Sequence, residues 1–122
     1  VDVLLLLVED KELARCRVTH VEEAAVAHGL ELVRHPVRDP MTPYSDAAYR
    51  REVAAVTERV RSGGTVAIAC RGGLDRSGMT AACLLREAGL DADVAIDRVH
   101  AARQHTLTMP EQLDYVRGWP HA

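Results

Sequence analysis

The chain has 122 residues, a length that fits one domain with one hydrophobic core. Apolar residues make up 48% of it, and because phenylalanine is absent we expect alanine, valine and leucine to supply the packing. The net charge near −3, the single tryptophan and the scattered basic residues exclude a nucleic-acid scaffold. Three widely spaced cysteines match neither a disulfide framework nor a zinc pattern. We expect a single catalytic domain over residues 1–122.

The first half of the chain predicts two strands and two helices. Val3–Val8 is an apolar run typical of a parallel strand covered on both faces. This run is too short to span a membrane, and it lacks the basic flank of a signal peptide. Thr19 and Glu22 have the spacing of a capping box, which predicts a helix that Gly29 ends. We also expect a strand over residues 30–35, a loop with two prolines over residues 38–45 and a long helix over residues 46–61.

The second half predicts a third strand over Thr65–Ala69, followed by three helices. Two of these helices are expected over residues 77–88 and from Asp91 to about Arg103. Thr108 and Glu111 have capping-box spacing, so the last helix should begin there. Strands that alternate with helices predict an α/β fold with a central, mostly parallel sheet flanked by helices.

A loop with several potentially catalytic side chains joins the third expected strand to the helix that follows it. Its residues are Cys70, Arg71, Gly72, Gly73, Leu74, Asp75, Arg76 and Ser77. Backbone N–H groups at a helix N-terminus favour an anion, and glycines let the backbone curl around a small ligand. The same field favours the thiolate form of a cysteine, and the planar fork of Arg76 matches two phosphoryl oxygens. The loop therefore predicts a phosphate cradle with a nucleophile beneath it.

The spacing of Cys70, Arg76 and Ser77 resembles the loop of the cysteine-dependent protein tyrosine phosphatases. The full string is similar to the small dual-specificity branch, especially the cyclin-dependent-kinase-associated phosphatases and their bacterial relatives. Other strings that resemble this family are Val1–Val8, Glu12-Leu13, Arg17-Val18, His28-Gly29, His35-Pro36-Val37 with Asp39, Ala81–Leu85, Ala95–Asp97, and Gln112 with Tyr115. The resemblance implies a (phosphotyrosine protein) phosphatase II-like fold. Whether this chain lacks some N-terminal strands of that fold stays open.

The resemblance also implies roles for individual residues. Cys70 would be the nucleophile, and the loop from Arg71 to Arg76 would bind the phosphoryl group. Asp39, on the proline-flanked loop, would be the general acid, and we favour it over Asp46, which suits the first turn of a helix. Ser77 would help break the covalent intermediate, with an N-cap as the alternative or additional role. Gln112 would position the hydrolytic water, unless it is merely a solvated helix residue.

Two positions depart from the family pattern. Ala69 stands where the family usually has the histidine that helps to hold the loop. Asp75 stands where glycine is common, and a carboxylate beside a phosphate site repels substrate unless it is paired or points away. Asp75 could orient Arg76 or serve as a second acid.

The sequence therefore predicts a metal-independent phosphatase, with no cofactor, that uses a phosphocysteine intermediate. Its partner would be a phosphorylated protein, carrying phosphotyrosine or phosphoserine/threonine, or another phosphomonoester. The histidines lack metal-ligand spacing, so we expect no metal site. We expect a monomer that binds neither nucleic acid nor membrane, in the cytoplasm, where a thiolate stays reduced. A rhodanese-type sulfurtransferase and a non-catalytic phosphoprotein-binding module remain the alternatives.

Overall fold

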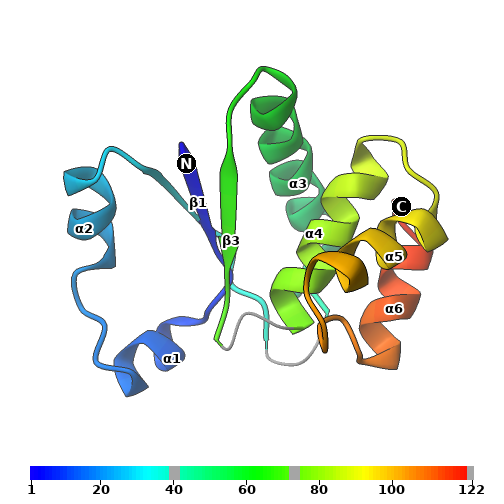
Figure 1. Cartoon of the computed structure of the whole chain (residues 1–122). Coiled ribbons are helices and arrows are strands. Elements are labelled where there is room, and N and C mark those ends of the chain that lie inside the picture. Colours follow the sequence, from blue (N-terminus) through cyan, green and yellow to red (C-terminus); the bar gives the residue numbers. More distant parts are fainter. Residues whose placement is uncertain (39–41, 72–74, 121–122) are drawn as a thin grey trace.

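The computed structural model describes residues 1–38, 42–71 and 75–120 (Figure 1). The strands are β1 (Val3–Leu6), β2 (Glu31–Arg34) and β3 (Val66–Ala69). The helices are α1 (Asp10–Arg15), α2 (Val21–Ala27), α3 (Asp46–Arg61), α4 (Asp75–Glu87), α5 (Ala92–Ala102) and α6 (Pro110–Arg117). The predicted α/β class is confirmed.

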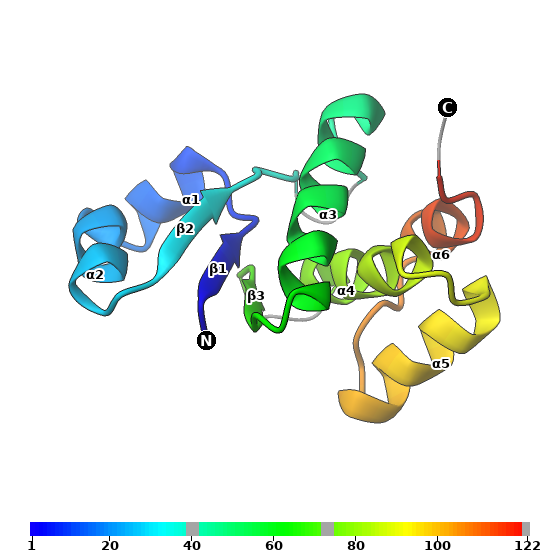
Figure 2. The same cartoon turned by 90° about the horizontal axis from the view of Figure 1, so that it is seen from above.

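The three strands form a parallel sheet in the order β2-β1-β3. Leu5 of β1 is in register with Val33 on one side and Ile68 on the other. Figures 1 and 2 place α1 and α2 on one side of this sheet and α3 to α6 on the other. Both faces of β1 are covered, and all four of its residues are apolar, as predicted. The carboxyl ends of all three strands meet at the edge where β3 leads toward α4.

The core lies between the sheet and the helices packed on α4. Tyr49 stands edge-on to Tyr115 and Trp119, with ring centroids 6.0 and 5.9 Å away. These rings supply much of the bulk that a chain without phenylalanine lacks. The guanidinium of Arg86 donates to the carbonyl oxygens of Leu90, Val116 and Trp119, which ties the C-terminal segment to α4.

Several predicted helix boundaries are confirmed. Helix α3 spans the expected residues, and Gly63 follows it with a φ of 95°, in the region that favours glycine. Gly29 ends α2 in the same way, with a φ of 70°. Within the described ranges, no helix is both long and apolar enough to cross a membrane.

Both predicted capping boxes are wrong. Helix α2 has His20 at its N-cap and no side-chain capping hydrogen bond. Helix α6 starts with Pro110 after Met109, and the hydroxyl of Thr108 donates to Asp75 instead of capping. A capping box does form at the start of α1, a helix that the sequence analysis did not predict.

Candidate active site

The predicted strand, loop and helix are present around Cys70. Cys70 directly follows β3, and α4 begins at Asp75, so Arg76 and Ser77 lie in the first turn of this helix. We expected the helix to begin only at Ser77, and this boundary is wrong; the alternative role of Ser77 as an N-cap is excluded because it lies inside the first turn. Four predicted site residues lie outside the described residues: Asp39, Gly72, Gly73 and Leu74.

The sulfur of Cys70 has a hydroxyl donor beside it. Ser77 Oγ donates to Cys70 Sγ over 3.0 Å, and Ser77 is buried. The Cys70 thiol can itself donate to the carbonyl oxygen of Arg71, at 3.6 Å. A hydroxyl that donates to sulfur favours negative charge there, both on an attacking thiolate and on a departing one. This contact brings together two of the predicted catalytic residues.

The guanidinium of Arg76 is buried and held in one orientation. Its Nη1 and Nη2 atoms donate to the two carboxylate oxygens of Glu12 over 2.7 and 2.8 Å. Nη1 also donates to the carbonyl oxygen of Val37 over 2.9 Å. Glu12 and Val37 thus occupy the Nη1–Nη2 end of the guanidinium. Held in this orientation, the guanidinium keeps the planar geometry that matches two oxygens of a phosphoryl group.

Glu12 is the functional residue that the sequence analysis missed. Its hydrogen bonds with Arg76 lower its pKa from 4.5 to about 2, although burial opposes this shift. The backbone N–H of Glu9 donates to Glu12 Oε1 over 3.0 Å and helps to hold the carboxylate ionised. The signal for this helix was the spacing of Glu9 and Glu12 directly after a strand.

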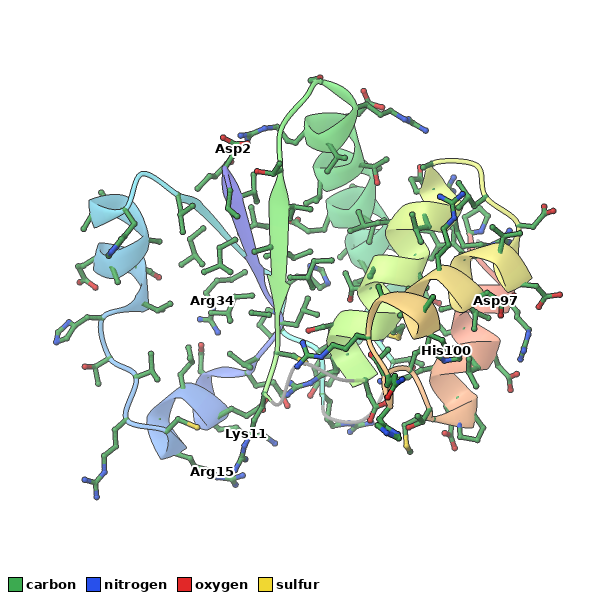
Figure 3. All side chains as sticks on the ribbon, viewed as in Figure 1. Asp2, Lys11, Arg15, Arg34, Asp97 and His100 are labelled. Carbon is green, nitrogen blue, oxygen red and sulfur yellow. The ribbon has the colours of Figure 1, made fainter. Side chains whose placement is uncertain are left out.

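Arg34, at the end of β2, fixes where α1 begins. Its guanidinium donates to Asp10 Oδ1 over 2.6 Å and to the carbonyl oxygen of Val8 over 2.9 Å (Figure 3). Because Asp10 is the first residue of α1, these bonds attach the helix to the sheet and place Glu12. Figure 3 shows Lys11 and Arg15 projecting from the same helix near the end of β3.

Asp75 is turned toward the segment that precedes α6. Its Oδ1 accepts from the backbone N–H of Thr108 over 3.0 Å and from the Thr108 hydroxyl over 3.2 Å. The carboxylate that accepts hydrogen bonds from the Arg76 guanidinium is that of Glu12. Pairing with Thr108 offsets part of the repulsion that a carboxylate exerts on a bound phosphate.

Two other predicted residues have defined surroundings. Gln112 is fully buried on α6, so the interpretation as a solvated helix residue is wrong. Asp46 lies in the first turn of α3, as expected, and accepts a hydrogen bond from the Tyr115 hydroxyl over 2.8 Å. Burial, together with this bond, raises the pKa of Tyr115.

A tyrosine and an arginine flank the segment that contains Asp39. Tyr44 is exposed, and its hydroxyl donates to Glu9 Oε2 over 2.7 Å. The Arg38 guanidinium lies 5.6 Å from the centroid of the Tyr44 ring, within the range of a cation–π contact. Helix α1 thus contacts Arg76 through Glu12, and its N-cap Glu9 contacts Tyr44.

A cavity of about 570 Å³ lies on another side of the first turn of α4. Its wall includes Ser77, and also Arg103, the basic residue just after α5. Most of the lining is apolar: Val60, Val66, Ile68, Ala81, Leu84 and Leu85. An apolar wall does not suit a phosphate dianion. Among the described residues, no cluster of three histidine, cysteine or acidic side chains could hold a metal ion.

A parallel strand followed directly by a cysteine, with an arginine in the first turn of the next helix, is typical of the cysteine-based phosphatases. Solved structures support this class. The structure is similar to Tk-PTP in its active form, with a TM-score of 0.84 and 30% identity over 98% of this chain and 78% of that one. It shares the fold of kinase associated phosphatase with its catalytic cysteine replaced by serine, at a TM-score of 0.87 and 24% identity over 97% and 67% of the chains.

PTPMT1 in complex with PI(5)P has the same fold, with a TM-score of 0.81 and 21% identity over 96% of this chain and 74% of that one. The model of the tyrosine phosphatase family matches residues 9–112. The chain therefore belongs to the tyrosine phosphatase family, and the family and fold predicted from the sequence are confirmed. Among curated protein sequences, none matches this chain significantly.

Proposed function

We propose that this phosphatase hydrolyses phosphomonoesters through a covalent phosphocysteine intermediate, without a metal ion. The contact that carries the proposal is the 3.0 Å hydrogen bond from Ser77 Oγ to Cys70 Sγ. It places a thiolate-stabilising donor on the sulfur, next to an arginine whose orientation is already set by Glu12. Phosphoryl transfer depends mainly on such positioning and on neutralising the phosphoryl oxygens.

The reaction would proceed in two displacements. In the first, Cys70 Sγ forms a bond to phosphorus, the bond to the leaving oxygen breaks, and Asp39 gives that oxygen its proton. In the second, a water positioned by Gln112 attacks phosphorus and its proton returns to Asp39. The sulfur–phosphorus bond breaks, inorganic phosphate leaves, and Ser77 stabilises the departing thiolate. Arg76 and the N–H groups from Arg71 through Asp75 bind the equatorial oxygens throughout.

We propose phosphorylated protein, with phosphotyrosine or phosphoserine/threonine, as the substrate class. Exposed basic side chains on α1 and on the segments that follow β2 and β3 would attract a phosphate dianion: Lys11, Arg15, Arg38 and Arg71. We also propose that residues 1–122 act as one catalytic domain and as a monomer. A reducing cytoplasm would keep Cys70 competent.

The test is turnover of p-nitrophenyl phosphate by the wild-type protein in the presence of EDTA. We expect phosphate release that EDTA does not affect and that vanadate inhibits competitively, because vanadate resembles the five-coordinate transition state. Sulfur transfer from thiosulfate to cyanide without phosphate release would instead establish the sulfurtransferase. Phosphopeptide binding without turnover would establish the non-catalytic module.

Asp39→Asn is expected to separate leaving-group protonation from nucleophilic attack. The loss in kcat should be about 10²–10⁴-fold for phosphotyrosine and much smaller for esters with good anionic leaving groups. The basic limb of the pH–rate profile should flatten, because this limb reports loss of the proton from the acid. Asp46→Asn is the matched control. If Asp46→Asn or Asp75→Asn flattens that limb and Asp39→Asn does not, the assignment of the acid is wrong.

A further inference from the structure

The α5–α6 loop, residues 103–109, packs tightly against the first turn of α4. Thr106 and Leu107 are buried, and a Cβ at Gly78 would lie only 2.3 Å from Thr106 Oγ1. Glycine is therefore required at position 78 for this approach. The loop also holds two non-glycine residues in the left-handed region, His105 with a φ of 61° and Leu107 with a φ of 53°. Such a conformation persists only where surrounding contacts enforce it.

Contacts from two helices hold the loop in place. On α4, Asp75 Oδ1 accepts both the backbone N–H and the hydroxyl of Thr108, at 3.0 and 3.2 Å. On α5, His100 Nε2 lies 3.2 Å from the carbonyl oxygen of Leu107 (His100 is labelled in Figure 3). The Asp75 contacts are charge-assisted, and hydrogen bonds to an ionised acceptor are stronger than neutral ones.

The loop leads directly into the helix that carries Gln112. Helix α6 starts at Pro110, two residues after Thr108, and Gln112 is its third residue. The Gln112 side chain is fully buried, so its position follows the position of α6 and cannot adjust freely in solvent. Asp75, for its part, immediately precedes Arg76 in α4. One carboxylate thus connects the phosphate-binding turn to the start of α6.

We propose that Asp75 is a positioning residue that ties the phosphate-binding turn to α6 and so sets Gln112 for the hydrolytic step. This inference rests on the proposed phosphocysteine mechanism. It gives the aspartate a role other than that of a second acid, since its Oδ1 faces Thr108. The role concerns only the second displacement, because Cys70, Arg76 and Asp39 suffice to form the intermediate.

The kinetic consequence distinguishes this role from others. Asp75→Ala should slow hydrolysis of the intermediate about 10-fold or more, since small misplacements of a positioned group have effects of that size. Because kcat/KM reports only the steps up to formation of the intermediate, kcat and KM should fall together and kcat/KM should stay within about twofold. In rapid mixing, the burst of p-nitrophenol should approach one equivalent of enzyme.

Matched variants and a second measurement make the test specific. Asp75→Asn keeps an oxygen acceptor and should restore most of kcat, whereas Thr108→Val removes only the hydroxyl donor and should give an intermediate loss. Asp93→Ala, which removes an exposed acidic residue from the first turn of α5, should leave kcat and KM unchanged. Amide hydrogen exchange at Thr108 should be faster in Asp75→Ala than in the wild type, whatever the activity.

Two outcomes would overturn the inference alone while wild-type turnover is intact. One is an unchanged kcat, KM and Thr108 exchange rate in Asp75→Ala. The other is a fall in kcat/KM with a flattened basic limb, which would make Asp75 an acid. A wild-type protein without turnover would overturn the proposed function and this inference with it, so the two failures are distinguishable.

Discussion

Cys70→Ser is expected to lower kcat for p-nitrophenyl phosphate by at least about 10³-fold while the protein stays folded. A serine hydroxyl is a weak nucleophile near neutral pH unless a base adjoins it. The described partners of Cys70 Sγ are the hydroxyl of Ser77, which donates to the sulfur, and the carbonyl oxygen of Arg71, and neither can act as that base. Phosphate release under saturating substrate measures the loss, and circular dichroism checks the fold.

The other two cysteines supply the controls for this prediction. Cys83 lies on the buried face of α4, and burial raises the pKa of its thiol to about 12, so it stays protonated. Cys16 is exposed at the end of α1, and Cys16→Ser should retain full activity. Iodoacetate should therefore inactivate the wild type through Cys70 and should inactivate Cys16→Ser equally. Residual turnover above about one part in 10³ in Cys70→Ser would contradict a phosphocysteine intermediate.

The sequence predicted correctly those elements whose structure depends on residues close together in the chain. The apolar run at β1, the glycine that ends α2 and the boundaries of α3 each depend on neighbouring residues, and each was predicted correctly. The loop after β3 was recognisable for the same reason. Its cysteine, arginine and serine all lie within eight residues, between an apolar run and a helix.

Contacts between distant segments were out of reach of the sequence analysis. Glu12 and Arg76 are separated by 64 positions, and no local pattern pairs one acidic residue with one of many arginines. At Thr108, a long-range contact instead overrides a local pattern. Its spacing to Glu111 satisfies the capping rule, but the tertiary contact with Asp75 takes its hydroxyl. The missed Glu12 and the wrong capping box at Thr108 thus both concern side chains that have long-range partners.

The sheet and two carboxylate contacts hold the loop at whose start Ala69 replaces the family histidine. Ala69 ends β3 in register with Leu6, and its carbonyl oxygen accepts from the backbone N–H of Leu7 over 2.9 Å. The strand end that presents Cys70 is therefore held by the sheet itself. On the helix side, Glu12 and Thr108 fix Arg76 and Asp75. These backbone and carboxylate contacts act on both ends of the loop where the family histidine is absent.

Glu12→Gln is expected to impair both activity and stability, because it leaves a buried guanidinium without its charged partner. Removing one member of a buried ion pair costs about 3–5 kcal/mol, a large part of the stability of a small domain. We expect kcat to fall about 10²-fold as well, since Arg76 would lose the carboxylate that orients its fork. Arg76→Lys should fail similarly on activity, because a point charge cannot make the bidentate contact.

The pH dependence of stability provides the sharper measurement. The folded-state pKa of Glu12 is lowered from 4.5 to about 2, so the folded protein binds this proton less readily than the unfolded chain. The contribution of the pair is therefore fully present above about pH 4.5, and it is lost as the pH falls toward 2. A shift of this size corresponds to about 3 kcal/mol of the free energy of unfolding. Urea unfolding at pH 7, 4 and 3 should show a steeper loss for the wild type than for Glu12→Gln.

The matched control is the exposed pair of Glu31 and Arg59, which has the same chemistry outside the core. Glu31→Gln should change the free energy of unfolding by less than about 1 kcal/mol, because solvent screens an exposed pair. Its pH dependence should remain parallel to that of the wild type. If Glu12→Gln and Glu31→Gln give the same curves, the carboxylate of Glu12 does not hold Arg76 in solution. If Glu12→Gln is destabilised but keeps full kcat, the pair supports the fold, and the loop alone orients the arginine.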